Sequence, residues 1–196
     1  MKLDLSFWKN ASLIRKRVYL VLFIFLVATL VTFIASAMPI TPQEAYALTN
    51  EVNQTLQQNL AQNTLVQGIF VNNFVICLIM FIPLGGLALG MQILFNTGVG
   101  YAGIAYVKGY PVSLALANSM TTPVFWLEFA AYSIAMAESI WLFRRILQAS
   151  NAKEFGAWSR MLGHELKWTA IFVGTCAGSL ALGAVVEAWL ITVLGG

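Results

Sequence analysis

Charged side chains are scarce in this sequence: 10% of its 196 residues are Asp, Glu, Lys or Arg, whereas 59% are hydrophobic. Soluble globular domains carry about 25% charged residues, so this composition excludes the soluble class. Several apolar runs exceed the roughly 20 residues that an α-helix needs to cross a bilayer. We therefore predict an all-α fold, a polytopic membrane helical bundle with no separate soluble domain.

Cysteine and histidine are also scarce. Cys77 and Cys176 both lie in apolar segments, where a thiol is usually a packing residue, so a disulfide framework is not expected. The sole histidine, His164, has no second histidine at the spacing of a helical zinc site. The sequence also lacks a Gly-x-Ser-x-Gly elbow and a Gly-Lys-Ser/Thr phosphate loop. These absences predict a protein that is not an enzyme and that has no metal or cofactor.

Positive charge is distributed unevenly along the chain. Ten of the eleven Lys and Arg residues lie in 1–17 or 144–167, and Lys108 is the exception. Because Lys and Arg are enriched in cytoplasmic loops, this pattern indicates membrane orientation and not nucleic-acid binding. It predicts a multi-pass protein of the cell membrane with a cytoplasmic N-terminus and an extracytoplasmic C-terminus.

The apolar runs predict about five transmembrane helices, at residues 18–38, 69–95, 97–119, 122–143 and 168–194. The remaining stretches are a cytoplasmic basic segment, an extracytoplasmic polar helix or loop and a cytoplasmic loop, at residues 1–17, 39–68 and 144–167 respectively. The first run follows basic residues as a signal peptide does, but it is longer than a signal core, so we interpret it as an uncleaved helix.

The third predicted crossing is broken at Lys108-Gly109-Tyr110-Pro111, which separates two apolar pieces that are each too short to span. Non-helical backbone at membrane depth is tolerated only where protein buries it or water reaches it. We therefore expect this break in the bundle interior or near an outer vestibule. If 97–119 were re-entrant, the Arg144 segment would lie outside, which the charge distribution disfavours.

The polar stretch 39–68 contains the signals of an outer helix. Thr41-Pro42-Gln43-Glu44 matches a capping box with Pro at the first helical position. The apolar residues that follow recur every three or four positions and include Leu48, Val52 and Leu56. This narrow stripe either packs on the protein's own helix ends or binds a partner.

Three glutamates, Glu128, Glu138 and Glu187, lie inside predicted crossings, where an ionised side chain costs about 2.5–3.5 kcal/mol or more unless it is paired, protonated or hydrated. They are expected to face the interior. Two roles fit: a charge pair that holds the broken segment around Lys108, or a lining for a proton or cation path. Alternatively, Glu138 snorkels to the surface near Arg145, and the same alternative is open for Glu187.

Amide and small residues supply candidate helix contacts. Asn72 and Asn73 near the start of the second crossing, and Gln92 and Asn96 near its end, are expected to bond across helices or to satisfy the broken backbone; a solute site is the alternative. Small residues let helix backbones approach closely. We expect such packing, within or between chains, at Gly86, Gly90, Gly98, Gly174 and Gly178.

Three motifs stand out: Phe70-Val71-Asn72-Asn73, Pro123 to Glu128 with Ala131, and residues 184–192. Together they resemble the stage II sporulation protein M family. The first matches its aromatic-x-Asn-Asn signature, the second is similar to its Pro-His-Gly-x-x-Glu-x-x-Ala segment, and the third is similar to its closing Ala-x-x-Glu-Ala-x-x-Thr. Val124 and Phe125 replace the family's His-Gly, so any role of that histidine is absent. The resemblance covers most of the chain from residue 68 onward, and it carries over Glu128 and Glu187 but not Glu138.

The resemblance implies a membrane scaffold, because the founding family member looks like a scaffold that recruits cell-wall hydrolases. The first hypothesis is therefore a non-enzymatic integral membrane scaffold or complex subunit. Its expected partners are the lipid bilayer and other integral membrane proteins or a second copy of this chain, with no nucleic acid. The second hypothesis is a small oligomeric transporter or channel, in which Glu128 and Glu187 line the path and the break at 108–111 forms part of a gate.

Overall fold

The computed structural model describes residues 11–150 and 155–194. In this part of the chain the fold is all-α, with seven helices and no strand: α2 Leu13–Ser36, α3 Pro42–Ala61, α4 Leu65–Met80, α5 Gly85–Lys108, α6 Val112–Thr121, α7 Pro123–Ser150 and α8 Phe155–Leu194. Three stretches are long and apolar enough to cross a membrane: α2, α5 and residues Leu162–Val193 of α8. The predicted all-α fold is therefore confirmed, and three of its helices fit the prediction of a membrane protein by length and composition.

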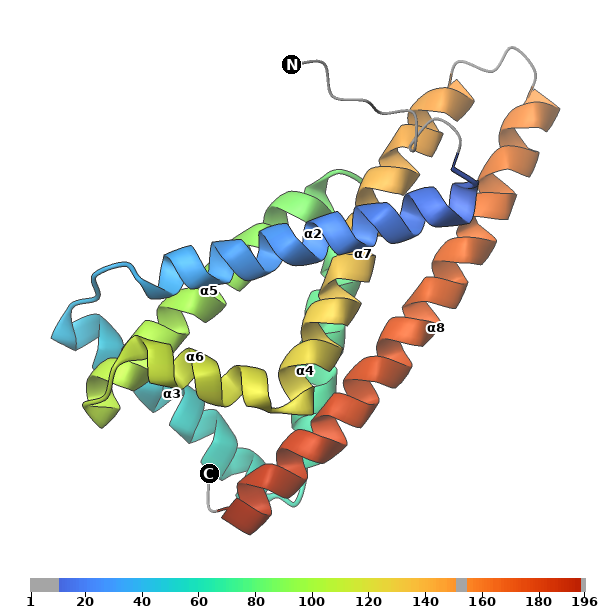
Figure 1. Ribbon diagram of the computed structural model, residues 1–196. Helices are drawn as coiled ribbons and strands as arrows, with labels where there is room; N and C mark the ends of the chain where they lie inside the picture. Colours follow the sequence, from blue (N-terminus) through green and yellow to red (C-terminus); the bar gives the residue numbers. More distant parts are fainter. Residues whose placement is uncertain (1–10, 151–154, 195–196) are drawn as a thin grey trace, which may run out of the picture.

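The helices form two packed groups (Figure 1). Helix α7 packs along α8, and α4 packs against both of them. Helices α2 and α5 pack on each other, and each also contacts α7. Helices α3 and α6 lie at the side where the two groups diverge, with α3 packed mainly on α5 (Figure 1). The start of α2 lies at the end of the molecule where α7 ends and α8 begins (Figure 1).

The first two helices begin at local capping signals. Helix α2 starts five residues earlier than the predicted 18–38 crossing, because Ser12 caps it by accepting a hydrogen bond from the Arg15 N–H at 3.3 Å. Residues 1–10 of the predicted basic segment lie outside the described residues. The predicted capping box of α3 is confirmed: Thr41 Oγ1 accepts from the Glu44 N–H, and the Glu44 carboxylate accepts from the Thr41 N–H. The Thr41 hydroxyl also donates to the Glu44 carboxylate at 2.7 Å, and this bond, together with the one from the Thr41 N–H, lowers the pKa of Glu44 below its ordinary value.

The predicted second crossing, 69–95, is not one helix. Helix α4 ends at Met80 and α5 begins at Gly85. Between them Leu84 has φ 61° and ψ −50°, and the Gly85 N–H donates to the Pro83 carbonyl at 2.7 Å. This i to i+2 bond and these dihedral angles define a γ-turn. The turn docks on α7, because Ser139 Oγ donates to the Ile82 carbonyl at 2.6 Å.

Replacing Leu84 with Gly is expected to raise the free energy of unfolding by about 1 kcal/mol, because a non-glycine residue in such a conformation stores about 1–3 kcal/mol of strain. The Leu84 side chain is 54% exposed, so little packing is lost. Leu182→Gly is the matched control, an exposed leucine inside α8, and it should lower stability by about 1 kcal/mol. Thermal unfolding in detergent measures both, and equal losses for the two variants would contradict strain at Leu84.

The predicted third crossing, 97–119, is divided between two elements. Residues 97–108 form the last part of α5. The predicted break is confirmed: α5 ends at Gly109, which has a φ of 70°, and α6 begins after its N-cap residue, Pro111. Lys108 and Gly109 are exposed, so this break is not in the bundle interior. The predicted cytoplasmic loop 144–167 is also largely helical, because α7 continues to Ser150 and α8 begins at Phe155.

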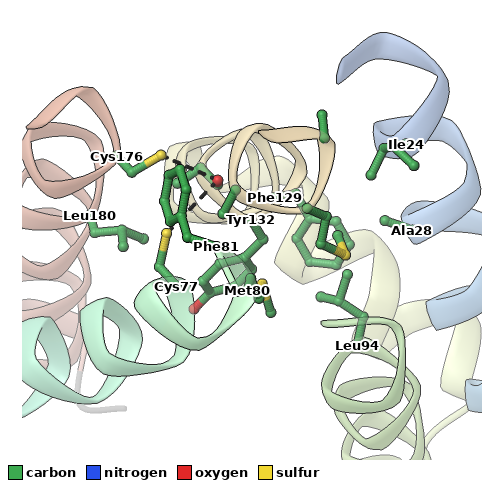
Figure 2. Close-up of a cluster of buried hydrophobic side chains, with 14 of the residues drawn as sticks. Ile24, Ala28, Cys77, Met80, Phe81, Leu94, Phe129, Tyr132, Cys176 and Leu180 are labelled. Atoms are coloured by element: carbon green, nitrogen blue, oxygen red, sulfur yellow. Dashed lines mark hydrogen bonds between the residues drawn. The ribbon is translucent and has the colours of Figure 1, made fainter. Parts of the chain in front are cut away.

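An apolar core joins the two helix groups through α7. Cys77 from α4 and Cys176 from α8 approach α7 from two sides, and both thiols donate to the Ala131 carbonyl, at 3.9 and 3.4 Å (Figure 2). Toward α2, the buried side chains of Phe125 and Phe129 stack with a centroid separation of 4.1 Å. Both cysteines are free and buried.

Candidate functional site

Two of the predicted intramembrane acids meet in one cavity. Glu128 at the start of α7 and Glu187 near the end of α8 line a cavity of about 430 Å³. Asn72 and Asn73 from α4 line the same space, and α3 borders it with Glu51 and its neighbours. Helix α3 therefore forms one wall of a carboxylate-lined cavity, an arrangement that sequence spacing alone does not reveal.

The asparagine pair binds the first of these acids. Asn73 Nδ2 donates a hydrogen bond to Glu128 Oε1, and Asn72 Nδ2 donates to Asn73 Oδ1 at 3.3 Å. The expected bond across helices is thus present for Asn73, which connects α4 to α7. Chemically, a carboxylate held by an amide donor beside a second carboxylate offers acceptor oxygens for a proton or another cation.

Lys108 does not belong to this site. It is exposed in the last turn of α5, where a cation interacts favourably with the C-terminal end of the helix dipole. In the described part of the chain every salt bridge involves Arg17, Arg145 or His164. The hypothesis that an intramembrane glutamate holds the broken segment by pairing with Lys108 is therefore wrong for this structure.

The third acid, Glu138, lies near the middle of α7 and belongs to a second polar site. It is 2% exposed, and Arg17 Nη1 from α2 donates to its Oε2 at 2.8 Å. Arg17 Nη2 also donates to Glu165 of α8. The snorkelling alternative for Glu138 is wrong, because the carboxylate is buried and paired. A basic residue expected at the membrane surface instead connects three helices.

Arg17, Glu138 and Glu165 form a buried ion cluster, and two further side chains bind the Glu165 carboxylate. Arg145 Nε lies 3.0 Å from its Oε1, and Trp141 Nε1 donates to its Oε2 at 3.2 Å. Aromatic rings enclose the Arg17 guanidinium, whose carbon lies 5.1 Å from the Trp141 ring centroid and 5.8 Å from that of Trp168. A buried charge needs this many partners, because leaving one unpaired is strongly destabilising.

Sequence reasoning missed Arg17 and Glu165 as site residues, since one was assigned to a basic flank and the other to a loop. The available signal was the Ser12 cap, which places Arg17 inside a helix and not before it. The pairing itself had no local signal, because Arg17 and Glu165 are separated by 148 positions in the sequence.

An apolar core separates the two polar sites. Glu128 and Glu138 are ten residues apart on α7, which corresponds to about 15 Å along the helix axis. Between these levels the buried residues include Ala131, Tyr132, Ala135 and Met136, and Cys77 and Cys176 close the same region (Figure 2). Ser133 adds one buried hydroxyl between these levels, so the region that separates the two sites is largely, but not wholly, apolar.

The predicted packing glycines divide into two groups. A Cβ at Gly86 or Gly90 would collide with Met80 or Met136, and one at Gly98 would collide with α2. These three positions therefore permit close contact between helices. By contrast, Gly174 and Gly178 are exposed and have no neighbouring atom within 4 Å of a built Cβ.

Asn96 lies outside both polar sites. Gln92 Nε2 donates to Asn96 Oδ1 at 3.1 Å, and both residues are exposed on the surface of α5. The expectation that this pair bonds across helices or satisfies the broken backbone is wrong within the chain, because the bond is an i to i+4 contact of one helix. Both amides lie near the middle of a helix that is apolar enough to span a membrane.

The apolar stripe of α3 is only partly covered. Leu48 and Val52 are 37% and 59% exposed, while Leu56 is half-buried and lines the acidic cavity together with Val52. The stripe thus contributes to the protein's own cavity wall and also leaves apolar surface exposed.

Comparisons with known proteins found no match: no protein-family model, no curated protein and no solved structure matches the chain.

Proposed function

We propose that this protein is a non-enzymatic integral membrane scaffold or complex subunit that binds another membrane protein, or a second copy of itself, through α5. The observation that carries the proposal is the exposed amide pair of Gln92 and Asn96 near the middle of that helix. Polar side chains within membrane segments almost always face a bundle interior or a hydrated cavity. An exposed pair therefore indicates a surface that a further helix covers.

The chemistry of the pair fits a helix partner. Each amide side chain has two N–H donors and an acceptor oxygen, and the bond between them uses one donor and one acceptor. The other groups would be unsatisfied against lipid, at a cost of several kcal/mol for each group. A neighbouring helix can approach closely here, because Ala88 and Gly100 flank the pair on the same helix and no atom lies within 4 Å of a Cβ built at Gly100.

We further propose five crossings in the cell membrane with a cytoplasmic N-terminus, formed by α2, α4, α5, α6 together with α7, and α8. The distribution of Lys and Arg supports this orientation, because both segments assigned to the cytoplasm, residues 1–17 and 144–167, are basic. The aromatic-x-Asn-Asn motif and the two glutamate motifs support membership of the stage II sporulation protein M family, and Asn73 and Glu128 of those motifs are bonded to each other.

The proposal predicts that Gln92→Leu with Asn96→Leu weakens the complex. Interhelical polar bonds in membranes contribute about 0.6–1.7 kcal/mol each, so losing two should raise the dissociation constant about tenfold or more. Mass photometry of particles in native nanodiscs measures the assembled fraction. The control is Thr175→Val, which removes an exposed hydroxyl of α8 that already bonds the Ile171 carbonyl. An unchanged particle mass for the double variant would contradict the proposal.

The acidic cavity supports a second candidate function, cation or proton conduction, because two carboxylates line one space of about 430 Å³. Under this alternative, Glu128→Gln and Glu187→Gln should assemble normally but lose flux in liposomes. Under the scaffold proposal the same variants should leave background flux unchanged. Glu44→Gln is the control for a change of charge outside the cavity, because Glu44 does not belong to the cavity lining and Gln can also complete the capping box of α3.

A further inference from the structure

A second cavity, of about 650 Å³, is lined by residues within 12–22 at the start of α2, 134–145 of α7 and 164–172 of α8. We call it the α2–α8 groove. Its lining is mainly apolar and includes Leu13, Val18 and Leu22 of α2, Trp141 of α7, and Trp168 and Phe172 of α8. The α2 residues are about half exposed, so the groove is open along one side.

One end of the groove is polar. Arg17, Arg145, His164 and Glu165 line it there. The Arg17 guanidinium is anchored by both Glu138 and Glu165, whereas the Arg145 side chain is 21% exposed and the His164 side chain is 64% exposed. These last two groups can therefore reach a ligand at the mouth of the groove without leaving the ion cluster.

The end of the molecule around this mouth carries a strong excess of positive charge. In the described part of this end, residues 13–17 of α2, 138–150 of α7 and 159–167 of α8 carry seven cationic side chains and two anionic ones, Glu138 and Glu165; the cations are Arg15, Lys16, Arg17, Arg144, Arg145, Arg160 and Lys167. A ligand with a negative head is complementary to this surface, and the apolar lining requires the rest of that ligand to be hydrophobic.

The hydrophobic part of the ligand would lie beyond Arg17. There the lining consists of Val18, Val21 and Leu22 of α2, Ile134 of α7, and Trp168 and Phe172 of α8. Apolar side chains from three helices therefore continue the groove past its polar end. We propose that the α2–α8 groove binds one acyl chain of an anionic glycerophospholipid, with the lipid phosphate at Arg145 and His164. In the orientation proposed above, this lipid belongs to the cytoplasmic leaflet.

Tryptophan fluorescence tests the proposal directly, because Trp168 lines the groove. The full chain in neutral detergent micelles is titrated with phosphatidylglycerol or phosphatidylcholine carrying the same brominated acyl chains, which quench indoles on contact. The difference between the unmodified protein and Trp168→Phe isolates the Trp168 signal. Phosphatidylglycerol should reach half-quenching at a mole fraction at least fivefold lower than phosphatidylcholine, and 1 M salt should narrow this gap.

A pair of matched variants separates the groove from the general lipid-facing surface. Val18→Phe with Leu22→Phe narrows the groove and should raise the phosphatidylglycerol midpoint at least fivefold. Leu26→Phe with Leu30→Phe adds the same rings to exposed positions of α2 outside the groove lining and should change nothing. Equal midpoints for the two lipids, equal effects of the two double variants, or no quenching of Trp168 would each overturn the proposal. Since the assay uses micelles, its outcome is independent of membrane orientation and of partner binding.

Discussion

Replacing Arg17 with Met is expected to lower the free energy of unfolding by about 3–5 kcal/mol, the penalty for removing one partner of a buried ion pair. Glu138 and Glu165 are 2% exposed, and both bind Arg17. Total stabilities are about 5–15 kcal/mol, so the yield of folded, monodisperse protein should fall severalfold or more. Size-exclusion chromatography in detergent and thermal unfolding measure the two effects.

Two further variants identify the cause. Arg15→Met changes an exposed arginine two residues away, and its effect should stay within about 0.5 kcal/mol. Adding Glu138→Gln to Arg17→Met should recover much of the loss, because Glu165 retains Arg145 and Trp141 as partners. If Arg17→Met is no more destabilising than Arg15→Met, the ion cluster does not stabilise the fold.

Replacing Gly98 with Ala is expected to separate α2 from α5 and to lower stability by about 1–3 kcal/mol, the usual range for overpacking a close contact. A Cβ at this position would lie 2.7 Å from the Ala35 Cβ and would also collide with the Thr32 carbonyl oxygen. The oxygen cannot move independently of the α2 backbone. The same contact contains a hydrogen bond from Thr32 Oγ1 to the Leu94 carbonyl at 3.1 Å, which the separation would break.

The matched control for this change is Gly174→Ala in α8. Gly174 is exposed, and no atom lies within 4 Å of a Cβ built there. Alanine is the better helix former by about 1 kcal/mol, so this variant should be neutral or more stable. Thermal unfolding of both variants under one condition provides the comparison, and a similar gain for Gly98→Ala would show that α2 and α5 are not in close contact.

How much of the fold can be predicted from the sequence depends on where the local signals are. The capping box at Thr41 and the break at Gly109 are encoded by a few adjacent residues, and both are found as expected. The turn between α4 and α5 is different, because apolar residues continue through it and Leu84 adopts a positive φ that its side chain does not predict. Docking on Ser139 of α7, more than 50 positions away, holds that turn in place.

The candidate sites show the same division. The positions of Glu128 and Glu138 inside apolar runs predict that both face the interior, although for Glu138 the sequence also allowed snorkelling to the surface. Their partners are set by three-dimensional packing: Asn73 reaches Glu128 across 55 positions, and Arg17 reaches Glu138 across 121. Residue spacing reports only contacts within one helix, so it places an acid in the membrane without identifying the group that neutralises it.

The most direct test of the proposed function is site-specific photo-crosslinking in native membranes. A photoreactive residue at position 96 is compared with one at position 26, which is 68% exposed on α2 and lies outside the proposed contact surface. We predict that position 96 crosslinks to a protein, either a second copy of this chain or another membrane protein, while position 26 crosslinks to lipid. Lipid adducts alone at both positions would contradict the account, because the amides of α5 would then face the bilayer and not a partner helix.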